Sequence, residues 1–195
     1  LSIIGGHADT NGFRPEVNAL LDSGFNCTGV VECAAKVRLA SQNGADIIKI
    51  TATGGVLSQQ GRGLEAHFTP EEMKAIADTA HSLGLKVMAH AHGARGIQQA
   101  AEAGIDTIEH GTYLDEAAAK AMRDRGTVLI PTLMALEGVS EGLGKGIYTP
   151  VVENKIRAVQ PLMASLVSRA RKFGVTVAFG TDAGVYQHGR NAEEL

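Results

Sequence analysis

The sequence predicts an α/β fold on a parallel sheet, and three observations support this. Short apolar runs alternate with stretches of helical periodicity along most of the chain. The runs are continuously apolar rather than alternating, which indicates strands buried on both faces. Several runs begin at a glycine and end at a reactive side chain, as in 44–49, 84–90, 104–110 and 174–182. Two architectures fit this pattern: an open doubly wound sheet, or part of a (β/α)8 TIM-type barrel.

Composition places the chain among ordinary globular proteins. It has 195 residues, a net charge of −3 and 44% hydrophobic residues, which is enough for one core. The charge does not suggest nucleic-acid binding, and no run approaches the ~18 apolar residues of a membrane span. Cys27 and Cys33 fit neither a Cys-x-x-Cys motif nor a disulfide framework. We therefore expect free thiols, which favour a reducing compartment and a cytoplasmic location.

The first half of the chain is predicted as follows. Residues 1–28 are rich in Gly, Asp and Asn and are expected to form a loop. A helix is expected over about 29–43, then a strand over 45–53 and a polar loop over 54–68. The next helix is well marked, because Thr69 can cap it, Pro70 suits its first turn and Glu72 completes a capping box.

The second half repeats the same unit. The predicted strands are 85–91, 105–110, 127–133 and 175–181. The predicted helices are 93–103, 115–125 (closed by Gly126) and 150–173, with a glycine-rich loop at 138–147. Pro161 is expected to kink or divide the last helix. No GxGxxG fingerprint follows a first strand, which weakens a nucleotide-binding interpretation.

Two histidines occupy matched places in neighbouring units. His90 and His110 each lie six residues after a glycine. Neighbouring parallel strands are about 4.8 Å apart, so imidazoles at equivalent strand ends can share one cation. A single histidine is more often an ordinary surface or hydrogen-bonded residue than a metal ligand. A pair at matched positions is less easily explained as two such ordinary residues. Asp182 has an even offset from Gly174 and is expected to point the same way, although it could simply cap a helix.

Lys49 is flanked by Ile48 and Ile50 and is predicted to be buried, where an unpaired ammonium costs several kcal/mol. The alternative is a lysine at a surface edge. A buried amine that becomes neutral can form a Schiff base or react with carbon dioxide. The resulting carbamate has two oxygens, which can bridge two metal ions.

Four segments together resemble the amidohydrolase superfamily: Ile48–Gly55, Met88–Gly93, Ile108–Thr112 and Phe179–Gly184. The resemblance is strongest to the branch of metal-dependent Xaa-Pro dipeptidases (prolidases) and imidazolonepropionase-like enzymes. It runs over nearly the whole chain, from Gly5 to Gly189.

The resemblance implies a distorted (β/α)8 barrel with a binuclear zinc centre, here only from about strand 3 to strand 8. Lys49 would be carboxylated and bridge both zinc ions, and His90 and His110 would bind the more buried ion. Asp182 would bind the other ion and shuttle a proton from the metal-bridging hydroxide to the leaving amine. His92 would hold or polarise the substrate carbonyl.

The sequence departs from the family pattern at its start. No His-x-His pair precedes Lys49, and His7 stands alone there. We expect an internal fragment of a protein of roughly 400 residues, a size that fits a barrel with insertions. Residues 1–195 would form one partial metal-dependent hydrolase barrel domain, without the first barrel strands and the small β-sandwich domain.

Further residues are predicted to bind substrate from loops: Arg62, Tyr113 and His188, together with His92. Arg62, His67 or Arg190 could bind a dipeptide carboxylate, but ordinary solvated charge is the preferred interpretation for each.

The leading functional hypothesis is a zinc-dependent hydrolase of amide bonds, a dipeptidase of Xaa-Pro type. One alternative is an imidazolonepropionase-like cyclic amidohydrolase. Another is a Schiff-base lyase using Lys49, which leaves His90, His110 and Asp182 without a joint role. A non-catalytic interaction module is a third. The expected partner is a small-molecule or dipeptide substrate, without nucleic acid or membrane, and a homo-oligomer is left open.

Overall fold

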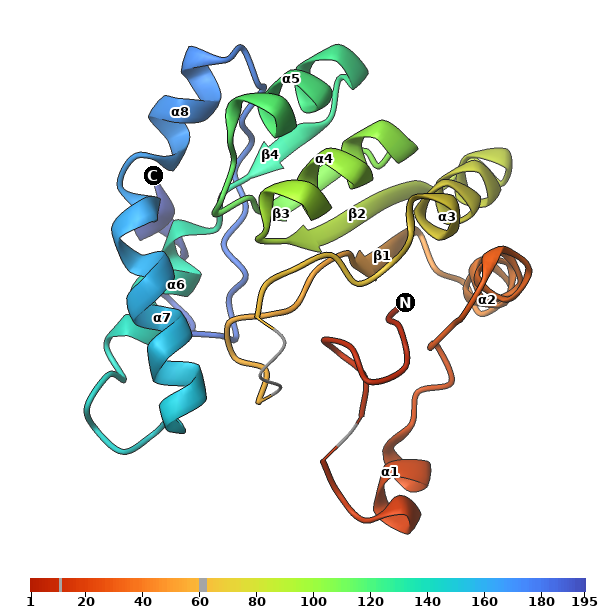
Figure 1. The fold of residues 1–195 in the computed structure, drawn as a ribbon, viewed down its shortest axis with the longest axis horizontal. Coiled ribbons are helices and arrows are strands. Elements are labelled where there is room, and N and C mark those ends of the chain that lie inside the picture. The colour runs from red at the N-terminus through yellow and green to blue at the C-terminus, as the bar shows by residue number, and fades with distance from the viewer. Residues whose placement is uncertain (11, 60–62) are drawn as a thin grey trace.

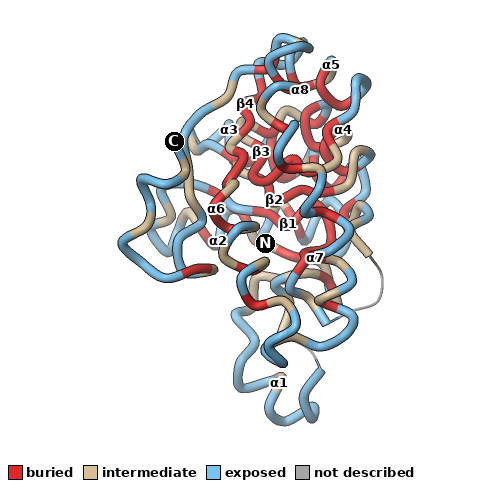
Figure 2. Tube along the Cα trace, turned by 90° about the vertical axis from the view of Figure 1, so that its left-hand side faces the viewer, coloured by how far each residue is buried: buried red, intermediate tan, exposed pale blue. Residues whose placement is uncertain are grey.

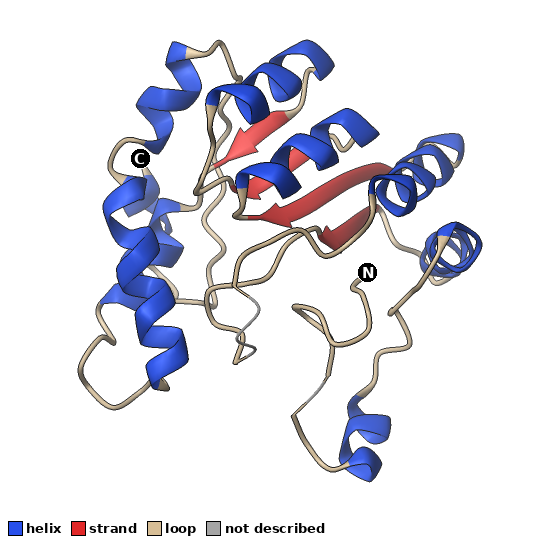
Figure 3. Cartoon of the chain, viewed as in Figure 1, coloured by secondary structure: helices blue, strands red, loops and turns tan. Residues whose placement is uncertain are grey.

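Four parallel strands form the centre of the fold in a computed structural model that describes residues 1–10, 12–59 and 63–195. They are β1 (Ile47–Thr51), β2 (Lys86–Ala91), β3 (Thr107–His110) and β4 (Val128–Ile130). Each strand pairs with the next in the order of the sequence (Figure 3). The parallel sheet predicted from the apolar runs is therefore confirmed.

Two short segments continue the sheet at its edges. Leu1 lies beside β1: its amino group donates to the Lys49 carbonyl, and its own carbonyl accepts from Thr51 N at 3.0 Å. At the other edge, Val177 pairs in parallel with Leu129. The strand predicted over 175–181 is thus reduced to one bridge, because β4 itself offers only three residues to pair with.

Four helices cover one face of the sheet, each following a sheet segment in the chain. They are α2 (Val30–Gln42), α3 (Pro70–Ser82), α4 (Ala94–Ala103) and α5 (Glu116–Arg125). Figure 1 shows them in a row across the sheet. The strand residues that face them are fully buried and form the main core: Ile48, Ile50, Val87, Ala89, Ile108 and Leu129.

The opposite face of the sheet is partly open, so the prediction of strands buried on both faces is wrong for this part of the molecule. Along β1 the burial alternates: Ile47 is 45% exposed, Ile48 is buried and Lys49 is exposed. The predicted burial of Lys49 is therefore also wrong. The physical reason is that no described helix packs on this face beside Lys49, and its flanking isoleucine Ile48 points into the helical layer instead.

The remaining helices follow β4 in the chain, apart from α1 (Pro15–Leu21), which projects from the body with no buried residue (Figure 2). They are α6 (Leu133–Ser140), α7 (Pro150–Met163), α8 (Leu166–Lys172) and a 3-10 helix at Asn191–Glu194. The helix predicted over 150–173 is divided as expected, but the break follows Met163 rather than Pro161 itself. The sequence predicts a loop over 1–28, and α1 within it is a helix instead.

Cys27 and Cys33 form a disulfide, so the prediction of free thiols is wrong. Cys33 lies in the first turn of α2, and the start of this helix folds it back beside Cys27 with a Cα–Cα distance of 5.0 Å. The spacing along the sequence did not reveal this return. The inference of a reducing compartment loses its basis. No helix in the described ranges has the length and apolar character to cross a bilayer.

Glu72 joins the starts of two helices. Its side chain and that of Thr69 form the predicted capping box of α3, with Thr69 N donating to Oε2 at 2.9 Å. Its other oxygen, Oε1, accepts from Gly29 N at 2.6 Å, immediately before α2. One buried carboxylate thus accepts from backbone N–H groups in two places, which fixes α2 against α3.

Replacing Glu72 with alanine is expected to lower the free energy of unfolding by about 2 kcal/mol, since two N–H groups lose a charged acceptor. Denaturant titration of the purified protein measures this. Glu71→Ala is the matched control, because Glu71 lies in the same first turn but is exposed. Equal effects of the two substitutions would contradict the role given to Glu72.

Candidate metal centre

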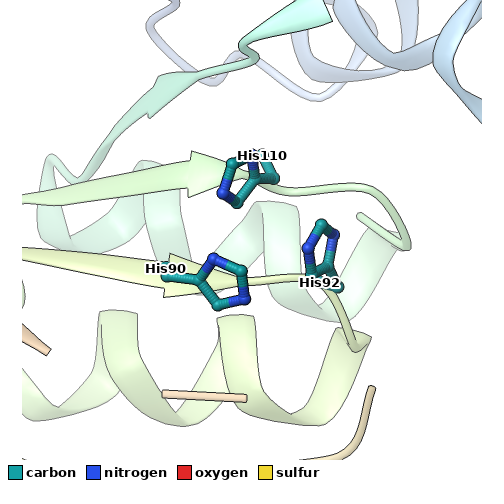
Figure 4. Close-up of side chains that lie close together, drawn as sticks. All are labelled: His90, His92 and His110. Carbon is teal, nitrogen blue, oxygen red and sulfur yellow. The ribbon is translucent and has the colours of Figure 1, made fainter. Parts of the chain in front are cut away.

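Three histidines converge where two neighbouring strands end. His90 lies in β2, His92 follows that strand and His110 is the last residue of β3. One ring nitrogen from each lies within 4.8 Å of the others. Figure 4 shows the three rings gathered at the tips of these strands. This is the arrangement in which imidazoles bind a transition metal, so the donor set fits a zinc ion.

His110 reaches the cluster through an unusual backbone conformation. The strand register pairs His90 with Glu109, and His110 with Ala91, whose side chain faces the helices. The equal offsets from glycine suggested that His90 and His110 occupy equivalent places in the sheet. The register shows that they do not. His110 has φ +73°, and this left-handed turn redirects its ring toward His90, with ring centroids 4.7 Å apart.

Hydrogen bonds fix which ring nitrogen of His110 is free. The Thr132 hydroxyl donates to the Pro131 carbonyl at 2.8 Å, so its oxygen must accept from His110 Nδ1, at 2.6 Å. The lone pair of His110 is then on Nε2. For His90 the assignment is reversed, because Nε2 lies 3.2 Å from the Gly54 carbonyl and must donate to it. His90 therefore offers Nδ1 to a ligand.

His92 is held in the same cluster. Its Nδ1 lies 2.8 Å from the Thr112 hydroxyl, and its ring stacks on that of His110 with centroids 4.7 Å apart. Its backbone N donates to the Thr53 hydroxyl at 2.9 Å. The structure thus places His92 beside the two histidines predicted to bind metal, and its predicted role toward the substrate carbonyl stays a prediction.

The environment keeps these rings neutral. Burial lowers the pKa of His90 and of His92 well below 6.5, and the neighbouring histidines lower both further. Burial, followed by the charges of Lys49 and His7, lowers the pKa of His110 to about 3. A neutral imidazole is the form that binds a metal ion, so the cluster is prepared for a cation.

His7, which stood alone in the sequence, lies against this cluster. Its ring centroid is 4.3 Å from that of His90, and its Nδ1 is 2.6 Å from the Ser58 hydroxyl. Burial, and then the charge of His67, lowers its pKa to about 4. Gly55 makes room for the ring, since a Cβ there would lie 2.3 Å from His7 Cε1. Gly55 and Ser58 belong to the loop after β1. Lys155 of α7 holds this loop by donating to the carbonyls of both residues.

Lys49 and Asp182 line the same pocket as the four histidines, in a cavity of about 290 Å³. Lys49 shares the sheet face of His90, because its register partner is Met88, two residues before His90. Desolvation raises the pKa of Asp182, and the charge of Lys49 partly opposes this. The outer walls are apolar and come mainly from α6, α7 and the loop after β1: Val56, Leu57, Ala135, Leu136, Val139, Val159, Met163 and Val185.

The backbone of this pocket is strained. Four non-glycine residues in the described ranges have positive φ: Ala8, His110, Thr132 and Asp182. All four line the pocket. Residues other than glycine seldom have a positive φ, and this backbone conformation costs about 1–3 kcal/mol at each position.

The other predicted substrate-binding residues do not meet there. Tyr113 lines a second, neighbouring pocket with Lys155 and Arg95. His188 is exposed and is not among the residues that line the histidine pocket. Arg62 lies outside the described residues. Arg190 forms ion pairs with Glu141 and Glu193, which agrees with the ordinary reading of its charge.

Sequence reasoning missed the hydroxyl groups around the cluster. Thr53, Thr112 and Thr132 each lie two residues beyond the end of β1, β3 or β4, and each contacts a cluster histidine. A threonine recurring just after successive strands was a signal available in the sequence, because hydroxyls there can orient histidines at the same edge.

Comparisons with known proteins give a consistent result. Residues 6–195 match the amidohydrolase family. Ochratoxinase of Aspergillus niger is 36% identical over 156 residues, which are 79% of this chain and 32% of that protein. A solved Xaa-Pro dipeptidase with bound methionine in its active site has 39% identity and a TM-score of 0.90, covering 100% of this chain and 48% of that chain. A prolidase complexed with N-methylphosphonate-L-proline has 31% identity and a TM-score of 0.84. The match covers 98% of this chain and 48% of the prolidase chain.

The chain therefore spans between about a third and a half of the length of these relatives. The predicted fold class, part of a (β/α)8 barrel, is confirmed by the similarity over the whole chain.

The cluster makes stability depend on pH in a defined direction. Unfolding exposes His110, whose pKa rises from about 3 to its ordinary value of 6.5. The unfolded chain thus binds more protons between these pH values, and the metal-free protein should lose stability as pH falls through this range, by about 1.4 kcal/mol per pH unit for each such histidine.

Denaturant titrations of the metal-free protein at several pH values measure this slope. In His110→Asn the free energy of unfolding should depend less steeply on pH than in the parent. The difference should correspond to the uptake of about one proton on unfolding. His188→Gln, outside the cluster, is the control. Identical slopes for the parent and His110→Asn would refute the assignment.

Proposed function

Because the chain belongs to the amidohydrolase family, we propose that the protein is a metal-dependent hydrolase of amide bonds, and that residues 1–195 form part of its catalytic barrel domain. The observation that carries the proposal is the histidine cluster at the strand ends, with Lys49 and Asp182 on the wall of the same pocket. This edge of a parallel barrel is where enzymes of this architecture have their active sites.

A zinc pair would be held by Lys49, His90, His110 and Asp182, with Lys49 as its carbamate between the two ions. The free Nδ1 of His90 and Nε2 of His110 support this assignment, because both lone pairs are left open by the hydrogen bonds of the other nitrogen. When bound, the metal would supply a Lewis acid for the amide carbonyl and lower the pKa of water.

Lys49 can meet carbon dioxide because its side chain is exposed on the pocket wall. A carbamate at its Nζ would carry two anionic oxygens, close to the cationic centre that the histidines would hold. Lys49 as a Schiff-base nucleophile remains chemically allowed at this position. It would, however, leave the hydrogen-bonded orientation of His90 and His110 without a purpose, so the hydrolase is favoured.

Asp182 is placed to handle the proton. Desolvation raises the pKa of its carboxyl, which makes the protonated form more accessible. It would take a proton from the attacking water and deliver it to the leaving amine nitrogen. His92 would donate to or polarise the substrate carbonyl, since it faces the same cluster and its Nδ1 is held by Thr112.

For the substrate we propose a dipeptide of Xaa-Pro type. The support is the similarity to the Xaa-Pro dipeptidase and to the prolidase with its proline-containing ligand. The apolar walls of the pocket fit an aliphatic side chain and a proline ring better than charged groups. The relative named ochratoxinase bears a different substrate name. The second substrate to test is a cyclic amide, which is the alternative that the sequence resemblance left open.

Lys49→Ala in the intact protein is expected to reduce Xaa-Pro hydrolysis by at least about 100-fold and to lower zinc content, because the bridging ligand is lost. Elemental analysis should find close to two zinc ions per site in the parent, and mass analysis should detect added carbon dioxide on Lys49. Chelation should abolish activity and zinc should restore it.

Lys86→Ala is the matched control, since Lys86 is an exposed lysine at the opposite end of β2. A panel of Met-Pro, Leu-Pro, Glu-Pro and a cyclic amide separates the substrate classes. Full activity of Lys49→Ala without zinc would refute the mechanism, and covalent trapping of substrate on Lys49 by borohydride would favour the lyase.

A further inference from the structure

Helix α6 begins in an unusual way. Its N-cap residue is Thr132, a residue type that ordinarily accepts a hydrogen bond from the helix N-terminus through its hydroxyl. Here Thr132 has φ +49° and makes no capping bond with its side chain. The hydroxyl is engaged instead with His110 Nδ1 at 2.6 Å and with the Pro131 carbonyl at 2.8 Å. A buried threonine thus serves the histidine cluster rather than its own helix.

The helix is capped by a distant residue. Glu194, in the 3-10 helix at the end of the described chain, accepts from Leu133 N and from Met134 N, both at 2.7 Å. Each carboxylate oxygen takes one of the first N–H groups of α6. Because a carboxylate at a helix N-terminus is also favoured by the helix dipole, Glu194 performs the task that the Thr132 hydroxyl would otherwise perform.

The 3-10 helix is itself fixed against α6. Arg190 forms an ion pair with Glu141, just after α6, at 2.7 Å and another with Glu193 at 2.8 Å. The segment 190–194 therefore contacts both ends of α6. This anchoring sets the position of the Glu194 carboxylate.

The two uses of the Thr132 hydroxyl require different conformations of Thr132. A threonine that caps its own helix has an extended backbone, whereas Thr132 accepts from His110 Nδ1 with φ +49° and makes no capping bond. With Glu194 absent, the free N–H groups of α6 would compete for the hydroxyl, and Thr132 would relax from its left-handed conformation into an ordinary N-cap. His110 would then lose the partner that fixes its orientation.

We propose that Glu194 is a positioning residue for the metal centre: by capping α6 it releases the Thr132 hydroxyl to orient His110. The inference rests on the proposed function only in that His110 is taken to be a metal ligand. The orientation of His110 itself can be measured without any metal.

The first test uses the intact protein, labelled with ¹⁵N in its histidines and freed of metal. In the parent, the ring nitrogen signals of His110 should have the pattern of a single neutral tautomer protonated at Nδ1. In Glu194→Ala they should move toward the average of two tautomers. Glu137→Ala is the matched control, because Glu137 is an exposed carboxylate on α6, and it should leave the signals unchanged.

The second test measures zinc affinity by competition with a chelator. Glu194→Ala should weaken zinc binding by about 10-fold, as expected for loss of an outer partner of a ligand. Thr132→Val, which removes the hydroxyl but keeps the shape, should weaken it similarly. The double variant should be no weaker than Thr132→Val alone, because Glu194 acts through that hydroxyl. Thr132→Ser should retain the affinity of the parent.

Glu194→Gln covers the case in which the alanine variant does not fold. Its amide oxygen can accept from one N–H of α6 while its NH₂ group cannot accept from the other, so an intermediate shift of the His110 signals is expected. Unchanged His110 signals in both folded Glu194 variants would overturn the inference, and so would additive effects in the double variant. If the parent binds no zinc, the proposed function fails, while the metal-free spectra still decide the role of Glu194.

Discussion

The register between β2 and β3 is the constraint on which the site depends. Parallel pairing brings the carboxyl ends of the strands to one edge, and this places His90 and His92 near His110. The same register opposes His110 to Ala91, so a regular strand would direct the ring into the helical layer. The left-handed φ of His110 corrects this, and the bond from its Nδ1 to Thr132 holds the corrected orientation. A shift of one residue in this pairing would separate the cluster.

The surroundings of the cluster then decide its chemistry. Hydroxyl groups and carbonyls engage one nitrogen of His90 and of His110 and leave the other nitrogen open. Burial makes the charged form of each ring unfavourable, so the open nitrogens are lone pairs rather than N–H groups. Loops outside the sheet complete this shell: Thr132 lies at the start of α6, and Gly54 lies in the segment that Lys155 holds against α7. The site thus combines rigid strand positions with loop groups that are themselves tied down.

Much of this could be predicted from the sequence, and the reasons are local. The helix starting at Thr69 and the one ending at Gly126 carry their own capping signals, and the apolar runs identify the strands. His90, His110 and Asp182 were predicted from their places after apolar runs, and Lys49 from an expected burial that is wrong, yet all four line one pocket. The disulfide, the exposure of Lys49 and the φ of His110 were not predictable in this way. They depend on how α2 returns to residue 27, on which sheet face is covered and on the register, and none of these is encoded in a short window.

The left-handed residues around the pocket have a consequence for how the sequence can vary. Ala8, His110, Thr132 and Asp182 hold conformations that glycine or asparagine would adopt at lower cost. Selection for stability alone would therefore favour replacing them. Glycine, however, lacks the imidazole of His110, the hydroxyl of Thr132 and the carboxylate of Asp182. The stability of the backbone and the proposed function would therefore favour different residues at these positions. Glycine at these positions would relieve backbone strain and at the same time remove side chains that line the pocket.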